Sequence, residues 1–431
     1  MSSTCSMPQS THSVTVRSPG SQRTMGADSV ALVRSVLEER AAELRSVSRF
    51  LWENPETAMR ETKAHDRLCE FLEGQDFRVR RHHYLATAFR ADYAAPGGAD
   101  GPTVALMAEY DALPDIGHAC GRNLVAQSSL GAAVAVKEAM AKFTDIRGKV
   151  VVLGTPAKEN NAGKIRMLEQ GAFHDIDVAM AAYPGTRDVL RCAFAASQKL
   201  TATYTGRASH AADSPWEGVN AADAAVSAYV SLAMLRQRIK PTSRVLALIE
   251  ECGHYPNIIP EASRLVCHVL TADPLELDAL QARAERCLYA AAHATSCSAA
   301  LQRGRRCKAF AHNDALVRAY RKHGKQLGVR FVDVDLTRTV PSGWASDAAN
   351  VSHELPTLLP TFAIGDSVDV HTREFAQAAG SDGAQAPTQR VTQMLALTAL
   401  DVLADADLFP RARKDLKEWK QSKQPPCTCP Q

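Results

Sequence analysis

Hydrophobic and polar positions follow two different periods along the chain, and the change from one to the other predicts the order of helices and strands. Residues 29–56 and 61–75 carry apolar side chains three and four positions apart, which predicts helices. The Asn54-Pro55 step is expected to end the first helical segment. Residues 76–94 alternate between apolar and polar side chains, which predicts a strand and a hairpin.

From residue 102 onwards, short apolar runs alternate with helical patterns. The predicted order is a strand at 102–113, a helix at 123–143, a strand at 148–160, a helix at 163–173 and a strand at 177–186. Such an alternation is typical of a mostly parallel sheet between helices. We therefore predict an α/β fold, a mostly parallel sheet with flanking helices.

Residues 197–310 show a different order of predicted helices and strands. One alternating strand, a long helix, two strands around a turn, a second long helix and a last strand follow one another there. This order is typical of a ferredoxin-like α+β unit with an antiparallel sheet. Because the α/β pattern then returns, we predict that this unit is inserted into a discontinuous domain formed by residues 28–196 and 311–406. Residues 1–27 are predicted to be a disordered tail, and residues 407–431 a polar tail containing Pro and Cys.

Composition narrows the class of protein and its partners. The chain has 431 residues and is 45% hydrophobic, enough for a sizeable core and two domains. The net charge is +3 and no basic stripe is interleaved with aromatic residues, which argues against nucleic acid as a partner. No window approaches the ~18 uninterrupted apolar residues of a transmembrane helix, which argues against a membrane. The basic run at 302–308 is interpreted as a solvated loop or strand end, with a binding patch as the alternative.

The N-terminus and the cysteines bear on the cellular compartment. The first residues are rich in Ser and Thr and lack an apolar block, which excludes a secretory signal. A disordered tail is the preferred interpretation, and a weak transit peptide is the alternative. Eleven cysteines are scattered without the spacing of a disulfide framework, which suits a reducing compartment. These patterns predict a cytoplasmic location.

Polar side chains follow the predicted parallel strands at the points where these strands end. Glu109 and Asp111 follow the first strand, Lys158 and Glu159 the second, and Tyr183 the third. Ligand sites in such sheets lie just outside the carboxyl ends of the strands. We therefore expect these five side chains to meet at one functional site.

Six stretches carry a resemblance to a known family. They are "AEYDALPDIGHACGRN", "GTPAKENNAGK", "ASHAADSPWEGVNAADAA", "PNIIPE", "SDAANVSHELPTL" and "HTREFAQAAG", in this order along the chain. Together they resemble the aminoacylase and carboxypeptidase family of metallopeptidases, over about residues 30 to 405. The closest resemblance is to its amidohydrolase branch, which includes indole-acetyl-amino-acid hydrolases and a dipeptidase for dipeptides with a basic C-terminal residue. The resemblance implies a catalytic domain interrupted by a lid that also dimerises.

The family's centre is binuclear, usually zinc or manganese, and this chain keeps only part of it. The resemblance places Cys120, Glu159 and His371 at retained ligand positions. Arg122 and Tyr183 stand where two ligand histidines belong. Lys158 replaces the glutamate that serves as general base, and Asp111 keeps the position of an orienting acid.

The resemblance also assigns positions in the lid. His210 keeps the histidine that stabilises the oxyanion, which the family is thought to supply across subunits. Asn257 lies in "PNIIPE" at a substrate-binding position, and Leu270 stands where an arginine that contacts the substrate carboxylate is expected. Most of the frame for a peptide-like or acylated amino-acid ligand is therefore expected to persist.

The substitutions predict a weakened metal site. Arginine is effectively always charged, and at about 4 Å each cation opposes a divalent ion by several kcal/mol. We expect no metal, or at most one weakly held zinc or manganese ion, and we expect Arg122 or Lys158 to fill the vacated space and pair with Glu159. Loss of the carboxylate base removes a contribution of ~10²–10⁴-fold to the rate. A lysine at 158 whose pKa Arg122 depresses enough for it to act as the base is the alternative.

Taken singly, each residue also has an ordinary interpretation. Cys120 fits a buried small hydrophobe, His371 a loop or core histidine, and His210 a satisfied polar residue under a loop. Glu159 fits an acid that favours the start of a helix. Only the ordered set of motifs favours a functional site.

Three functions are compatible with this sequence. The first is an inactive or strongly impaired member of the family that binds a peptide-like ligand or a partner, as a homodimer through the lid. The second is an active dipeptidase or aminoacylase with a rebuilt mononuclear centre. The third is a heterodimer partner of an active paralogue, in which His210 completes the neighbour's site.

Overall fold

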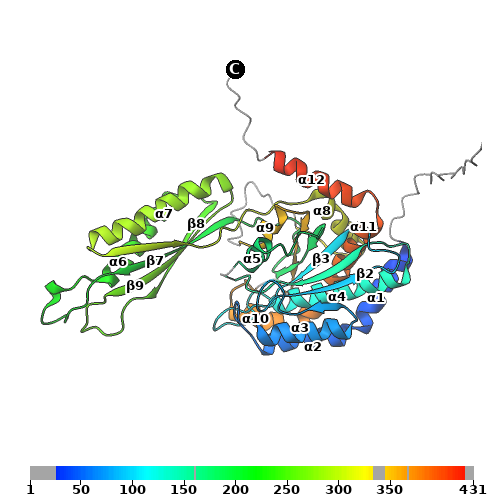
Figure 1. Cartoon of the computed structure of the whole chain (residues 1–431), viewed down its shortest axis with the longest axis horizontal. Helices are drawn as coiled ribbons and strands as arrows, with labels where there is room; N and C mark the ends of the chain where they lie inside the picture. Colours follow the sequence, from blue (N-terminus) through cyan, green and yellow to red (C-terminus); the bar gives the residue numbers. More distant parts are fainter. Residues whose placement is uncertain (1–25, 160–161, 333–344, 366–367, 423–431) are drawn as a thin grey trace, which may run out of the picture.

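The computed structural model describes residues 26–159, 162–332, 345–365 and 368–422, and it divides into an α/β domain and a lid domain (Figure 1). The central sheet of the α/β domain has the strand order β1-β2-β4-β3-β5-β11. Strands β3, β4, β5 and β11 are parallel, whereas β2 and β1 join antiparallel at one edge. The bounds are β1 Arg78–Arg80, β2 Phe89–Ala94, β3 Thr103–Ala108, β4 Lys149–Gly154, β5 Val178–Met180 and β11 Thr357–Leu358.

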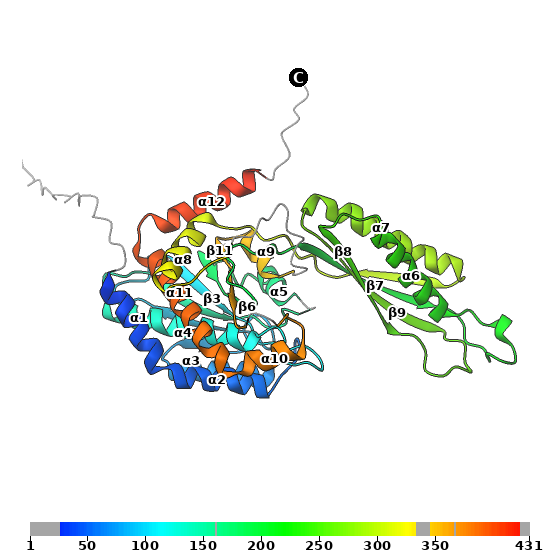
Figure 2. The same cartoon turned by 180° about the vertical axis from the view of Figure 1, so that it is seen from behind.

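Helices cover both faces of this sheet because its central strands are buried on both sides. All six residues of β3 are buried, and alternate residues belong to two separate apolar clusters. One face packs against α1 (Ala27–Glu39), α2 (Ala41–Glu53), α3 (Thr62–Gly74), α4 (Arg122–Lys142), α8 (Asp314–Gln326) and α11 (Gln385–Ala404). The other face packs against α5 (Gly163–Glu169) and α9 (Ala348–Ser352). A short parallel pair, β6 (Tyr183–Gly185) and β12 (Thr361–Ala363), and α10 (Arg373–Gly380) complete the domain on the side nearer the lid (Figure 2).

The lid domain is a four-stranded antiparallel sheet with two helices on one face. Its strand order is β10-β7-β9-β8, and every neighbouring pair is antiparallel. The elements are β7 Ala196–Thr205, α6 Ala221–Arg236, β8 Ser243–Glu251, β9 Ala262–Thr271, α7 Pro274–Ala294 and β10 Ser298–Arg303. In both views the lid projects to one side of the α/β domain (Figures 1 and 2). The predicted α/β class and the inserted ferredoxin-like unit are thus confirmed.

Two elements differ from the prediction. The segment predicted as one helix at 29–56 is divided at Arg40 into α1 and α2. Within 407–431, predicted as a polar tail, the structure forms α12 (Leu408–Ser422). This helix is fixed to α8, because the Asn313 side chain donates to the Ala412 carbonyl at 2.7 Å and Asp415 accepts the Ala315 N–H at 2.7 Å. The predicted tail at 1–27 and the "PPCTCPQ" end lie almost wholly outside the described residues.

The basic run at 302–308 behaves as a solvated surface. Its cations pair with nearby carboxylates, Arg303 with Glu285, Arg305 with Glu169, Arg306 with Asp278 and Lys308 with Glu354. None of the helices in the described ranges has both the length and the hydrophobicity of a membrane span.

Candidate active site

The start of α4 places two of the candidate residues at the mouth of a cavity. Gly121 precedes the helix with φ +61°, and a Cβ there would lie 2.4 Å from Cγ of Pro184. Only glycine meets both demands without strain. This turn directs Cys120 and Arg122, the residues on either side of it, toward the carboxyl ends of the parallel strands.

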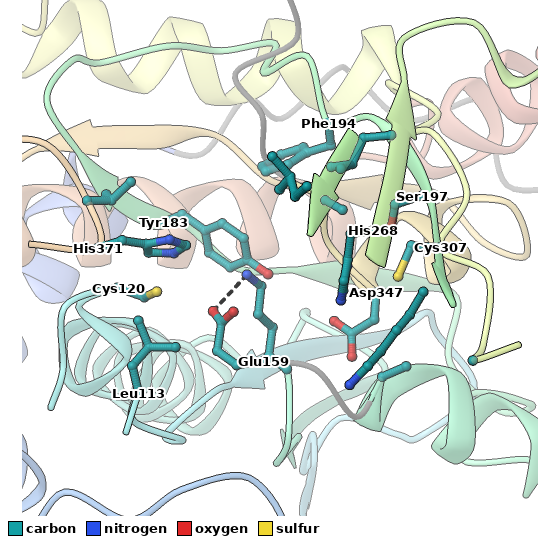
Figure 3. A pocket seen from close by; sticks show the side chains of 18 of the residues that line it. Leu113, Cys120, Glu159, Tyr183, Phe194, Ser197, His268, Cys307, Asp347 and His371 are labelled. Atoms are coloured by element: carbon teal, nitrogen blue, oxygen red, sulfur yellow. Dashed lines mark hydrogen bonds and ion pairs between the residues drawn. The ribbon is translucent and has the colours of Figure 1, made fainter. Parts of the chain in front are cut away.

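The three retained ligand positions come together there. One ligand atom each from Cys120, Glu159 and His371 lies within 4.8 Å of the others. Figure 3 shows these side chains at one end of the cavity, with Tyr183 beside them. His371 has φ +68°, and its N–H donates to the Ala119 carbonyl at 2.9 Å, which ties its loop to the Cys120 turn. The sequence therefore identified a real cluster of possible metal donors.

Two cations occupy the same space and pair with the retained glutamate. Arg122, which is 3% exposed, approaches Oε1 of Glu159 at 3.1 Å and Oε2 of Glu109 at 2.8 Å. Lys158 Nζ lies 2.8 Å from the same Oε1 of Glu159. The expectation that Arg122 or Lys158 pairs with Glu159 is confirmed for both residues. Burial opposes ionisation of Glu159, but Lys158 and Arg122 outweigh it and hold its pKa well below the usual range.

Tyr183 joins the network from the strand beside it. Its hydroxyl donates to Oε1 of Glu109 at 2.6 Å and lies 2.8 Å from Oγ of Ser346. The Arg122 guanidinium lies over its ring, 4.2 Å from the centroid. Tyr183 therefore holds Arg122 and Glu109 in place.

Lys164 and Asp347 complete the network, and the sequence reasoning missed both as site residues. Lys164 is fully buried, with Nζ 2.6 Å from Glu109 and 3.0 Å from Asp347. Asp347 also accepts the backbone N–H of Lys164 at 2.8 Å. A signal was available, because a lysine in the first turn of a helix opposes the helix dipole and needs a carboxylate partner.

Among the ion pairs of this network, positive and negative charges balance without an added ion. Arg122, Lys158 and Lys164 supply three positive charges, and their partners Glu109, Glu159 and Asp347 supply three negative charges. Paired buried charges are tolerated only when each has a close partner of opposite sign. The protein itself therefore supplies the cations that a metal centre would bring.

The residues present do not fit a binuclear metal centre. Glu109 and Glu159 already bind internal cations, and Tyr183 offers a protonated hydroxyl, because burial raises its pKa well above the usual value. Burial, and next Glu159, raise the pKa of the Cys120 thiol to about 12, so without an added ion this side chain stays a neutral thiol. A single ion at Cys120, Glu159 and His371 would have to displace both cations from Glu159.

Two buried carboxyl groups fix the loop that carries Lys158 and Glu159. Asp111 accepts the N–H of Glu159 at 2.8 Å, and Glu61 accepts the N–H of Ala157 at 2.8 Å. Ala157 has φ +56°, a conformation that costs energy for a residue with a side chain, so these bonds hold the loop against strain. The predicted orienting position of Asp111 therefore corresponds to a hydrogen bond to the backbone beside the site.

The buried Asp111 is expected to make the stability of the folded protein depend on pH. Burial, and next Glu159, raise its pKa to about 7, from roughly 4 in an unfolded chain. The folded state thus retains a proton that the unfolded state has released, and stability falls as pH rises from roughly 4 to about 7. We expect Asp111→Asn, which keeps an acceptor oxygen, to raise the melting temperature at pH 8 and to have little effect at pH 4. The exposed Asp76→Asn is the control, and an equal effect of Asp111→Asn at both pH values would contradict this assignment.

The lid residues His210 and Asn257 do not line this cavity in the described structure. Both are exposed, and the Asn257 carbonyl accepts the N–H of Ala211 at 3.0 Å, so they lie on neighbouring loops. Nδ1 of His210 faces the N–H groups of Ala212 and Asp213 at 3.2 and 3.1 Å. The structure brings these two predicted residues to each other but not to Cys120, Glu159 and His371.

The cavity itself has a volume of about 410 Å³ and lies between the two domains. The α/β domain contributes the charged network and the apolar side chains of Leu113, Phe194 and Val370. The lid contributes Ser197, Lys199, Leu246, His268 and Leu270. Figure 3 shows Ser197, His268 and Cys307 opposite the end that holds Cys120 and His371.

An α/β domain interrupted by such a lid is the architecture of the aminoacylase and carboxypeptidase type of metallopeptidases. The chain belongs to this family, together with the Xaa-Arg dipeptidases. It is 41% identical over 403 residues to Xaa-Arg dipeptidase of Mus musculus, covering 90% of this chain and 92% of that protein. It is 40% identical over 407 residues to the Homo sapiens protein of the same name, with the same coverage.

Solved structures confirm the fold. A dinuclear metal binding peptidase of the M20 family from Bacillus subtilis superposes with a TM-score of 0.61 at 18% identity, covering 85% of this chain and 99% of that chain. An aminobenzoyl-glutamate utilization protein from Klebsiella pneumoniae gives a TM-score of 0.62 at 18% identity, covering 85% and 96%. No family model matches the chain.

Proposed function

We propose that this chain is a non-hydrolysing member of the metallopeptidase family that binds a small peptide-like or acylated amino-acid ligand in the cavity between its domains. One observation carries the proposal. Oε1 of Glu159 forms ion pairs with Lys158 at 2.8 Å and with Arg122 at 3.1 Å. The negative charge of this predicted metal-ligating side chain is therefore already neutralised by the protein's own cations. The same lysine stands where the general base belongs, and its ammonium group cannot accept a proton while it is paired. The preserved lid and cavity support binding without turnover.

The direct test is to measure metal content and turnover together. We expect protein purified without chelator to contain close to no transition metal by mass spectrometry, and to leave Xaa-Arg dipeptides and N-acyl amino acids intact. The mouse relative, whose name is Xaa-Arg dipeptidase, is assayed in parallel as the positive control for dipeptide hydrolysis. Turnover that a chelator abolishes would refute the proposal.

That refuting result would favour the second function, a hydrolase with a mononuclear centre. The observation in its favour is that Cys120, Glu159 and His371 bring their ligand atoms within 4.8 Å of one another. One zinc or manganese ion per chain would then be expected, and His371→Ala would remove metal and activity together. Turnover that persists without metal would instead favour a metal-independent role for Lys158.

We also propose that the chain dimerises through its lid. A cytoplasmic location is proposed as well, because the scattered cysteines suit a reducing compartment. Helix α6 exposes an apolar stripe formed by Val226, Tyr229, Val230 and Met234, and β8 is an edge strand of the lid sheet. Exposed stripes and open edges of this kind mark protein interfaces. The same surface would serve a heterodimer with an active paralogue, in which His210→Ala in this chain would lower the partner's activity.

Val230→Glu tests the lid interface. A buried charge without a partner disfavours association, so we expect light scattering to show the mass of one chain for this variant and of two chains for the parent. Leu275→Glu, on the exposed start of α7, is the matched control and should remain dimeric. A monomeric parent, or a dimer that survives Val230→Glu, would contradict the lid interface.

A further inference from the structure

The lid closes the cavity with the face of its sheet that carries no helix. Side chains alternate along a strand, and in β7 and β9 one set, including Leu200, Cys267 and Val269, packs under α6 and α7. The other set points toward the cavity, and it includes Lys199 and His268.

Lys199 and His268 form a pair across the sheet. They are direct partners in the antiparallel register of β7 and β9, and Leu246 of β8 is the next partner in the same row. Directly opposite side chains in a sheet lie close enough to contact one group together. Burial, and next Lys199, lower the pKa of His268, so its ring is neutral near pH 7 and offers an N–H donor.

Lys199 differs from the other cations around the cavity. Arg122 and Lys158 pair with carboxylates of the buried network, and Arg305 approaches Glu169 at 2.8 Å. Among the residues that the structure describes, Lys199 has no ion pair, although it is half buried in the cavity wall. Lys199 is therefore a cation of the cavity wall for which the described residues supply no carboxylate partner.

We infer that the cavity selects a ligand with a single free carboxylate, an N-acyl amino acid with an apolar side chain, and that Lys199 and His268 hold this carboxylate. The rest of such a ligand would contact Leu113, Phe194 and Val370. A dipeptide ending in arginine has a net positive charge near pH 7, and its guanidinium would enter a cavity already lined by Arg122, Lys158 and Lys199. The selected ligand class thus differs from the one in the mouse relative's name. This inference rests on the proposed function, because it concerns the same cavity.

Titration calorimetry of the full chain at pH 7 with three probes tests the inference. N-acetyl-L-leucine carries the carboxylate, N-acetyl-L-leucinamide replaces it with a neutral amide, and L-leucyl-L-arginine adds the basic side chain. We expect the acid to bind at least tenfold more tightly than either of the other two probes. Equal binding of acid and amide, tighter binding of the basic dipeptide, or no binding of the acid would overturn the inference.

Variants assign the carboxylate to Lys199. Lys199→Met should weaken binding of the acid about tenfold or more and leave the amide unchanged, whereas Lys199→Arg should retain the preference for the acid. Lys240→Met, at an exposed lid lysine that pairs with Glu276, is the matched control and should bind as the parent does. An unchanged acid preference in Lys199→Met would overturn the assignment. Mass spectrometry of the probes after titration separates the two proposals, since hydrolysis would refute the proposed function while the affinities still decide the inference.

Discussion

A chain carrying Arg122→His, Lys158→Glu and Tyr183→His is expected to bind transition metal stoichiometrically, where the parent holds close to none. The parent already places Cys120, Glu159 and His371 together, so the substitutions would return donors to a cluster that the fold still positions. They also remove two of the cations that now neutralise Glu109 and Glu159. Imidazole and carboxylate donors suit zinc, and the released carboxylates would need a new positive charge.

Variants with only one of these substitutions separate the effect of the internal cations from the effect of the number of metal ligands. Lys158→Glu alone leaves Arg122 over the site, and Arg122→His alone leaves Lys158 on Glu159, so each single variant should hold much less metal than the triple variant. Metal per chain after dialysis is the primary measurement. Hydrolysis of dipeptides and N-acyl amino acids is the second, because a restored carboxylate base contributes ~10²–10⁴-fold to the rate. A folded triple variant without metal would show that the internal cations are not what excludes it.

The sequence predicts most of the fold because burial decides which positions along a helix or strand must be apolar. In β3 both sets of alternate residues are buried, and the uniform apolar run at 104–108 records this directly. Helix α12 escapes the same reasoning, since only Leu408 and Ala412 are buried and its attachment to α8 is polar. A helix fixed by a few hydrogen bonds leaves little trace in the hydrophobic pattern.

The candidate site is predictable only in part, for a related reason. Lys158 could be placed because it directly precedes Glu159 in the chain. Arg122 could be placed because its motif follows the neighbouring parallel strand. The pair Lys164 and Asp347 is separated by 183 positions, and nothing periodic in either segment connects them. The exposed positions of His210 and Asn257 depend on how far the lid extends, and no local pattern records that distance.

Replacing Lys164 by methionine is expected to destabilise the α/β domain by ~3–5 kcal/mol, because it leaves buried carboxylates without their cation. Glu109 would keep Arg122 and the Tyr183 hydroxyl, whereas Asp347 would keep the backbone N–H of residue 164 as its one remaining donor within the described ranges. Methionine matches the length and volume of the lysine stem, so the loss would come from charge and not from a cavity.

Thermal unfolding of Lys164→Met measures this cost, with a fall in melting temperature on the order of 10 °C expected at pH 7.5. Lys137→Met is the matched control, since this lysine also lies in a helix of the α/β domain but pairs with exposed Asp76 and Glu138, which is worth under about 1 kcal/mol. Burial already raises the pKa of Asp347, and loss of Lys164 would raise it further. The variant would therefore take up a proton on folding, and its deficit relative to the parent should shrink as pH falls toward 5. A deficit that stayed constant with pH would mean that packing, not the unpaired carboxylate, sets the cost.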